Sequence, residues 1–276
     1  MSPVKAIKTF RDLLSFLTII SWDGKEDFIF NTADHVYLFP LMGGFIGLLG
    51  AAYYVGASYV VRFLLGLVNL VIAVPTGFLL KLAVAAMTVA FLLVLTGLQH
   101  FDGLIDLGNA FGLRNLHDRK MVAHAWTVTY SGALLAIIVE FAAFAGLFFI
   151  SPLFAFGAIV AAEVSAKLSM VTILWVGKPA HKGLGSMFLQ RAKKKLNIIA
   201  YALSILIVYP FFAFTDKPFL GFISVGVVLV SIPVALVMEK VAESVFGGVS
   251  GDMIGATNEV ARAVTLILIA GVLVLI

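Results

Sequence analysis

The chain has 276 residues, of which 62% are apolar and only 12% are charged, and its formal net charge is +4. A soluble domain carries about 25% charged residues, and a soluble fold of this length cannot bury so much apolar surface. The composition therefore excludes a soluble globular protein and predicts an all-α, polytopic membrane protein. Cysteine is absent, which excludes disulfide bonds, thiolate metal sites and cysteine nucleophiles.

The first 22 residues predict an amphipathic helix at the surface of the bilayer. Lys5, Lys8 and Arg11 lie among apolar residues at helical spacing, a pattern typical of helices in the plane of the membrane interface. We expect no cleavable signal sequence, because no compact apolar core precedes a small-residue cleavage site. A short first transmembrane helix is the alternative interpretation.

The rest of the chain, residues 23–276, predicts a bundle of about seven transmembrane helices, and residues 1–276 form a single domain. A spanning helix needs about 20 mostly apolar residues. The candidate spans are roughly 38–61, 72–97, 130–149, 152–175, 197–214, 219–237 and 259–276. Residues 62–83 leave open a re-entrant piece or an extra span, so the expected count is six to eight.

The basic loop at residues 176–196 predicts the orientation of the bundle. It contains six Lys and Arg residues and no Asp or Glu, which places it in the cytoplasm by the positive-inside rule. Counting two helices in each direction puts residues 98–128 and 238–258 on the same side. We therefore expect a multi-pass protein of the cell inner (plasma) membrane, with its polar clusters facing the cytoplasm.

The first polar cluster follows a long apolar run. On a helix, Asp102, Asp106 and Asn109 occupy positions i, i+4 and i+7 and share one face. Mg²⁺ prefers such oxygen ligands, completed by water and by substrate phosphates. His100 points elsewhere and is a candidate base or substrate contact. The alternative is a set of solvated acids at a helix end.

The second cluster occupies residues 247–262. Asp252 and Glu259 are seven positions apart and share a helical face lined by small residues. The glycines up to Gly251 can expose backbone N–H groups near a helix N-terminus, where anions bind. The alternative is a glycine-rich turn with capping side chains.

The third cluster, in the basic loop, contains Lys178, His181 and Lys182. These side chains suit a polyphosphate or a nucleotide, and the alternative is that their charges only determine topology. We expect the later lysines of the loop, 193–195, to contact anionic lipid.

Three ionisable residues lie within the predicted spans. Glu163 and Lys167 are i and i+4 and are expected to neutralise each other, whereas Glu140 has no evident partner in the sequence. Carboxylates suited to Mg²⁺ and a cationic loop on the same side of the membrane predict Mg²⁺-dependent phosphoryl transfer. The residues themselves do not name the substrate.

At these residues the chain resembles the cobalamin 5'-phosphate synthase family, also called adenosylcobinamide-GDP ribazoletransferase. The run from His100 to Asp106 is similar to the family signature His/Glu-x-Asp-Gly-Leu-x-Asp, and the run from Gly251 to Glu259 is similar to Gly-Asp-x-x-Gly-Ala-x-x-Glu. Shorter similarities occur at residues 16–18, 38–43 and 182–185. The chain departs from the family pattern at Asn109, where Asp is usual, and across residues 118–132.

The resemblance implies that α-ribazole, or its 5'-phosphate, attacks the phosphate on the aminopropanol arm of adenosylcobinamide-GDP and releases GMP. It implies Mg²⁺ as cofactor, with Asp102, Asp106, Asn109, Asp252 and Glu259 holding the ion or its water. The implied catalytic residues are His100 as base with Asp102, Asp106 and Glu259, and the implied contacts to the GDP phosphates are Lys178, His181, Lys182 and Gly251. Besides these substrates we expect membrane lipid as a partner, no nucleic acid, and leave a homo-oligomer open.

Other functions compete with this interpretation. A CDP-alcohol phosphotransferase also uses helix-borne carboxylates, but its Asp-Gly-x-x-Ala-Arg element is absent, since Asp102-Gly103 continues as Leu-Ile-Asp. A transporter would use Glu140 and Glu163 as coupling groups, and it should show related halves and a midplane site, of which the sequence shows no sign. A non-catalytic scaffold would leave both acidic clusters without a purpose.

Overall fold

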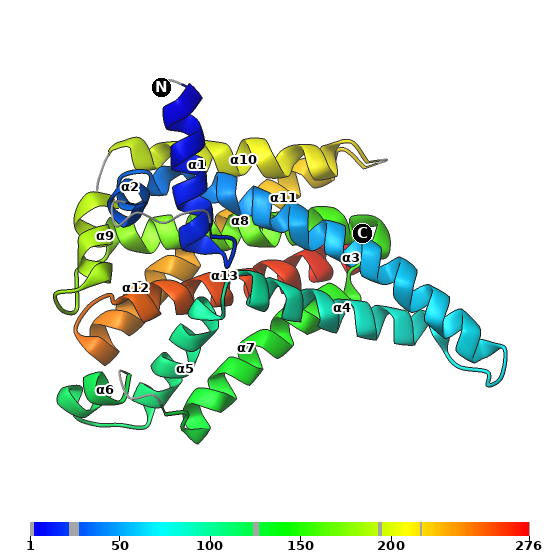
Figure 1. Cartoon of the computed structure of the whole chain (residues 1–276), viewed down its shortest axis with the longest axis horizontal. Helices are drawn as coiled ribbons and strands as arrows, with labels where there is room; N and C mark the ends of the chain where they lie inside the picture. The colour runs from blue at the N-terminus through cyan, green and yellow to red at the C-terminus, as the bar shows by residue number, and fades with distance from the viewer. Residues whose placement is uncertain (1–2, 22–27, 124–126, 193–194, 216, 276) are drawn as a thin grey trace.

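The protein is described by a computed structural model that covers residues 3–21, 28–123, 127–192, 195–215 and 217–275. Within these ranges the regular elements are helices, drawn in Figure 1. They are α1 (Pro3–Leu17), α2 (Phe28–Asp34), η1 (Val36–Leu38), α3 (Phe39–Asn69), α4 (Thr76–Leu95), α5 (Gln99–Phe111), α6 (Leu116–Ala123), α7 (Tyr130–Phe149), α8 (Pro152–Val176), α9 (Leu184–Ala192), η2 (Lys195–Asn197), α10 (Ile198–Ala213), α11 (Phe219–Leu229), α12 (Ser231–Phe246) and α13 (Gly251–Leu275).

Seven segments of the described chain are long and apolar enough to cross a membrane, which confirms the predicted polytopic helical bundle. They are Val36–Asn69, Thr76–Leu95, Tyr130–Phe149, Pro152–Val176, Lys195–Ala213, Phe219–Phe246 and Gly251–Leu275. The uncertain region 62–83 contains neither a re-entrant piece nor an extra span: α3 continues to Asn69 and α4 begins at Thr76. Figure 1 shows this α3–α4 hairpin projecting beyond the other helices.

Two predicted boundaries differ from the structure. The span predicted at 219–237 continues to Phe246 as two successive helices, α11 and α12, and α13 begins at Gly251 instead of residue 259. The polar residues in the first turns of α13 lower its hydropathy, but they are stabilised inside the bundle by partners that the local sequence does not show.

Helix α8 forms the centre of the bundle and packs against α3, α10, α12 and α13. Its side chains are buried on all sides, as expected of a helix that is apolar around its whole circumference. Helix α3 comes very close to it: a Cβ atom on Gly43 would lie 2.5 Å from the carbonyl oxygen of Glu163, and one on Gly47 would lie 2.7 Å from Val160 Cα. Small residues allow this close packing of helices in membranes.

The first 22 residues include α1, so a helix is present where one was predicted, although residues 1–2 and 22 lie outside the described part. One side of α1, including Asp12, Leu13 and Leu17, is buried, and the helix packs against α2 and α3. Its location at the membrane interface stays a prediction.

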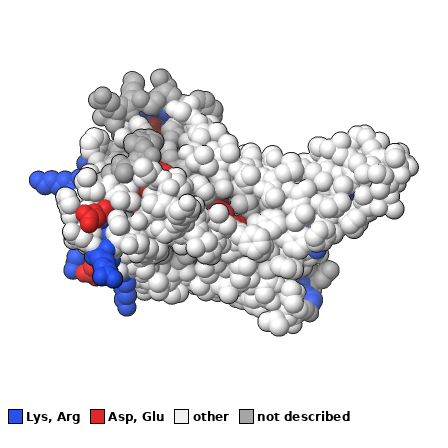
Figure 2. All heavy atoms as spheres, turned by 90° about the horizontal axis from the view of Figure 1, so that it is seen from below, with Lys and Arg blue, Asp and Glu red and all other residues white. Residues whose placement is uncertain are grey.

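Most of the charged side chains visible in Figure 2 gather at one end of the molecule. They lie over the end occupied by α6, α9 and α12 in Figure 1, while a smaller group of Lys and Arg atoms lies toward the other side and most of the remaining surface is white. A long apolar surface with one charged end is the arrangement expected of a protein surrounded by lipid whose polar loops reach water on one side.

Candidate active site

The two acidic clusters meet where α5 crosses α13. A Cβ atom on Gly103 would lie 2.3 Å from the carbonyl oxygen of Asp252, so a side chain at position 103 would collide with the first turn of α13. Asp102 and Asp252, which are 150 positions apart in the chain (252 − 102), are therefore carried by helices in direct contact. The crossing brings together the two stretches that the sequence analysis expected to share a site.

A sharp break between α4 and α5 sets the direction of α5. Gly97 and Leu98 have φ angles of +69° and +59°, in the left-handed region. Glycine adopts this region at little cost, whereas leucine rarely does. The break lets the chain leave the spanning helix α4 and lay His100 and Asp102 against α13.

Three carboxylates influence one another at this crossing. Burial raises the pKa of Asp106 to about 7, and the charges of Asp252 and Asp102 add to the increase. The side chain of Asp106 is buried, that of Asp252 is half-buried and that of Asp102 is exposed. Neighbouring like charges destabilise the ionised form of a carboxyl group, so a cation at this place would be favoured.

The carboxylates do not form a complete metal site by themselves. Within the described part of the chain, no three His, Asp or Glu side chains are close enough to hold a metal ion by themselves. Mg²⁺ is usually held by one or two carboxylates, with water and substrate phosphates as its other ligands. The donor set therefore fits an ion that arrives with a phosphorylated substrate better than a permanently bound structural ion.

The side chain of Asn109 is engaged elsewhere. Its Oδ1 accepts hydrogen bonds from the backbone N–H of Thr129 at 2.9 Å and from the Thr129 hydroxyl at 2.7 Å, and its Nδ2 donates to the Thr127 carbonyl at 2.9 Å. An amide oxygen has two lone pairs, so both are used. Asn109 thus ties α5 to the start of α7, and its metal role, which stays a prediction, does not fit this arrangement.

Glu259 lies deeper in the bundle than Asp252, by about 10 Å along the axis of α13 for seven residues. It is buried and accepts hydrogen bonds from Arg262 Nη1 and, at 3.0 Å, from Asn258 Nδ2. His100 Nδ1 lies 3.7 Å from its Oε1. Glu259 therefore lies beside His100 without a hydrogen bond to it. Both of its oxygens accept hydrogen bonds within α13, and its metal role stays a prediction that this arrangement does not support.

A buried network of charges joins α8 to α13. Arg262 Nε donates to Glu163 Oε1 at 2.6 Å, and Lys167 Nζ lies 3.3 Å from Glu163 Oε2 and 2.8 Å from Asn258 Oδ1. The predicted pairing of Glu163 and Lys167 is confirmed, but the sequence analysis assigned no role to Arg262 or Asn258. The sequence did contain a pattern that could have predicted such a role for Arg262, because Arg262 and Glu259 are three residues apart in an apolar span and can pair on one helix face.

Glu140 also lies near this network. It is located on α7, which packs against α13, and its carboxyl group interacts electrostatically with Glu259 and Arg262. Both of its carboxyl oxygens are buried and have no hydrogen-bond partner among the described residues, so Glu140 lies beside the network without joining its hydrogen bonds.

The imidazole of His100 faces a cavity. The side chain is buried, and burial lowers its pKa well below the ordinary value, with the positive charges of Lys167 and Arg262 adding to the effect. Its Nδ1 has no hydrogen-bond partner in the described structure. The imidazole is therefore held in its neutral form, which can accept a hydrogen bond from a hydroxyl group.

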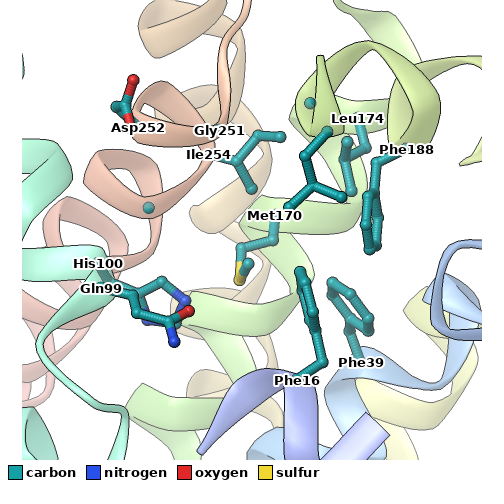
Figure 3. Close-up of a pocket in the computed structure, with 13 residues that line it drawn as sticks. Phe16, Phe39, Gln99, His100, Met170, Leu174, Phe188, Gly251, Asp252 and Ile254 are labelled. Carbon is teal, nitrogen blue, oxygen red and sulfur yellow. The ribbon is translucent and has the colours of Figure 1, made fainter. Parts of the chain in front are cut away.

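The cavity has a volume of about 180 Å³ and lies between α1, α3, α5, α8, α9 and α13. Figure 3 shows Gln99 and His100 on one side, the rings of Phe16, Phe39 and Phe188 on the other, and Met170 between them. The sequence analysis did not assign any of the apolar lining residues to the site.

The basic loop is attached to the segment that precedes α13. The backbone N–H of Val249 donates to the Lys178 carbonyl at 2.7 Å, and that of Ala180 donates to the Val249 carbonyl at 3.1 Å. A Cβ atom on Gly185 would lie 2.8 Å from the backbone nitrogen of Gly251. The loop therefore packs directly against the start of α13.

The predicted cationic residues are exposed at this same end. Lys178, His181 and Lys182 all have exposed side chains, and Gly185 and Asp252 of the adjoining segments line the cavity. The structure thus brings the third cluster beside the first two.

Comparison with known proteins gives consistent results. The family described as cobalamin-5-phosphate synthase matches residues 9–270. A protein of Methanocella arvoryzae named adenosylcobinamide-GDP ribazoletransferase is 32% identical over 224 residues, which is 73% of this chain and 84% of the relative. Proteins of the same name from Methanosarcina barkeri and Archaeoglobus fulgidus are each 28% identical, covering 95% and 92% of this chain and 91% and 92% of their own lengths.

No solved structure shows a significant match. The family match nevertheless extends over both acidic clusters, the basic loop and the apolar wall of the cavity. The chain belongs to the cobalamin-5-phosphate synthase family.

Proposed function

We propose that this chain is an adenosylcobinamide-GDP ribazoletransferase that joins α-ribazole, or its 5'-phosphate, to the phosphate of adenosylcobinamide-GDP at the charged end of the bundle. The names of its relatives and the family match support this activity. The observation that carries the proposal is the contact of α5 with α13, which gathers the acidic clusters beside the cavity and the basic loop.

We assign a Mg²⁺ site to Asp102, Asp106 and Asp252, of which one or two would bind the ion directly and the rest through its water, because the three do not form a complete metal site by themselves. We omit Asn109 and Glu259 because their oxygens have other partners. Mg²⁺ bound there would neutralise charge on the phosphate oxygens. The raised pKa of Asp106, caused by its burial and by the other two carboxylates, supports a cation at this place.

The chain's own residues then have separate roles. A hydroxyl of the ribazole forms a bond to the phosphate on the cobinamide side, the bond from that phosphate to the GMP phosphate breaks, and GMP leaves. His100 accepts the proton of the hydroxyl through Nε2, and Glu259, 3.7 Å from Nδ1, is placed to stabilise the imidazolium that forms. Lys178, His181 and Lys182, with the backbone N–H of Gly251, contact the phosphates of GDP.

The orientation of the site follows from the basic loop. Because positively charged loops remain in the cytoplasm, the charged end of the bundle faces the cytoplasm and the protein belongs to the inner (plasma) membrane. Both substrates would then approach from the cytoplasm.

The test uses the full-length protein, purified in detergent and returned to liposomes. With adenosylcobinamide-GDP, α-ribazole and Mg²⁺, we expect one GMP for each cobalamin product, and no product when α-ribazole or Mg²⁺ is omitted. Release of CMP from a CDP-alcohol would instead support the lipid phosphotransferase, and flux of substrate without turnover would support a transporter.

A further inference from the structure

We infer that the aromatic side of the cavity binds the base of the ribazole, a flat and apolar bicyclic ring, and selects it over a purine. This inference rests on the proposed function, because it assigns one of the proposed substrates to a particular wall of the site. Nothing in the two acidic clusters or the basic loop provides such a surface.

The wall is built from aromatic rings that come from separate parts of the chain. The rings of Phe16 in α1 and Phe188 in α9 stack with their centroids 4.8 Å apart at an interplanar angle of 21°. Phe39, the first residue of α3, stacks on Phe16 at 6.4 Å and 28°. Phe39 and Phe188 are buried, and Phe16 is half-buried. Because these rings already stack on one another, what they offer the cavity is mainly ring edges and the half-buried ring of Phe16. This is an apolar aromatic surface against which another planar ring can pack.

The chemistry of the wall distinguishes between the two bases present in the substrates. Besides the phenyl rings, this part of the cavity is lined by Met170, Leu174 and Ile254, whose side chains offer no strong hydrogen-bond donor or acceptor. Guanine carries several donors and acceptors along one edge, and each one buried without a partner is unfavourable. The dimethylbenzimidazole ring of ribazole presents only carbon and methyl groups along its outer edge, so the wall suits it better.

The size of the cavity limits what it can hold. Its volume of about 180 Å³ is below the roughly 300–1,000 Å³ typical of pockets for drug-sized ligands. A bicyclic base is small enough to enter, whereas a corrin ring is far too large. The cobinamide therefore remains outside, at the charged mouth.

The polar side of the cavity agrees with this placement. With the benzimidazole against the phenyl rings, the ribose lies toward His100, whose imidazole lines the opposite side of the cavity. Asp252 and Gly251, at the start of α13, also line the cavity. An attacking hydroxyl on the ribose is thus placed between His100 and the proposed phosphate site.

The test replaces single rings in the full-length protein. We expect Phe188→Leu and Phe16→Leu each to raise the Kd and the KM for α-ribazole about tenfold, while the KM for adenosylcobinamide-GDP changes less than twofold. The Kd is measured in detergent from the intrinsic fluorescence of the benzimidazole, without the second substrate. Phe16→Leu, at a half-buried position, provides the measurement if Phe188→Leu does not fold.

Phe212→Leu is the matched control. Phe212 is 2% exposed and its ring stacks on Phe154 at 6.4 Å and 4°, but it lies in α10 and does not line this cavity. We expect this variant to keep both KM values, which separates loss of the binding wall from general loosening of the bundle.

The selectivity gives a second measurement. We expect the wild-type protein to bind α-ribazole more tightly than the corresponding adenine riboside, and Phe188→Leu to reduce this preference. A raised KM for adenosylcobinamide-GDP with an unchanged constant for α-ribazole would assign the wall to guanine and overturn the inference.

Failure of the inference and failure of the proposed function give different results. GMP release with α-ribazole constants that are unaffected by both ring variants, in proteins with wild-type thermal unfolding, would reject the binding wall and leave the activity standing. Ring-dependent binding of α-ribazole without GMP release would reject the activity and retain the wall.

Discussion

Replacement of Gly103 by alanine tests whether the contact between α5 and α13 sets the geometry of the active site. The new Cβ would lie 2.3 Å from the Asp252 carbonyl oxygen, and ordinary contact begins at 3.4 Å, so the helices must move apart by about 1.1 Å (3.4 − 2.3). The opposing atom belongs to the backbone and cannot turn away. Overpacking of this kind costs about 1–3 kcal/mol, partly offset by the helix preference of alanine, about 1 kcal/mol.

The same displacement separates Asp102 and Asp106 from Asp252. A misplacement of about 1 Å can reduce the rate roughly 100-fold, so we expect kcat to fall by about that factor in a protein that still folds. Gly271→Ala is the matched control on α13, because no atom lies within 4 Å of the Cβ that it would add.

The assay is GMP release at saturating Mg²⁺ and saturating concentrations of both substrates, with thermal unfolding of each variant recorded in the same detergent. Wild-type kcat in Gly103→Ala would refute the reasoning, because the three carboxylates would then not need this helix separation. An equal loss in Gly271→Ala would show that alanine acts through the stability of the helix.

Further predictions concern the carboxylates and the buried network. We expect Asp106→Asn to abolish the activation by added Mg²⁺ and the exposed Glu243→Gln, on α12, to leave it intact; a Mg²⁺ titration of GMP release compares them. Because the proton of Asp106, with a pKa of about 7, must leave when a cation binds, the apparent Mg²⁺ affinity should rise with pH, about tenfold between pH 6 and pH 8; a pH-independent affinity would contradict the assignment. Arg262→Met leaves Glu163 and Glu259 buried without their shared partner and should destabilise the protein by about 3–5 kcal/mol. Thermal unfolding measures this loss, and adding Glu163→Gln should recover part of it; a double variant no more stable than Arg262→Met would argue against the ion pair.

The spans were predictable because each contains a long apolar run, and any helix that crosses the hydrocarbon core of a bilayer needs one. The start of α13 was predicted too late, since Asp252, Glu259 and Arg262 lower the hydropathy of its first turns. Arg262 is buried with a partner on another helix, Glu163 of α8, and a hydropathy window along one helix does not contain that information.

The site was predictable only where its residues lie on one helix. Helical spacing placed Asp102, Asp106 and Asn109 on one face, but it could not show that Asn109 meets Thr129, which lies in a stretch without a recognisable pattern. The pairing of Glu163 with Lys167 followed from their spacing.

The aromatic wall could not be predicted from the sequence. Phe16 and Phe39 lie in short stretches that resemble the family, but Phe188 does not, and nothing in the local surroundings of the 24 phenylalanines indicates which rings meet. Only the packing of α1, α3 and α9 around the cavity brings these three rings together.

The buried network also bears on how the chain enters the membrane during synthesis. Helix α8 carries Glu163 and Lys167 one turn apart, and α13 carries Glu259 and Arg262 three residues apart. An unpaired charge at the centre of an inserting helix costs about 2.5–3.5 kcal/mol, but each of these helices brings its own counter-charge. Helix α8 is synthesised before α13 and can therefore remain in the lipid as a neutral segment. Arg262 then pairs with Glu163 after α13 has been inserted.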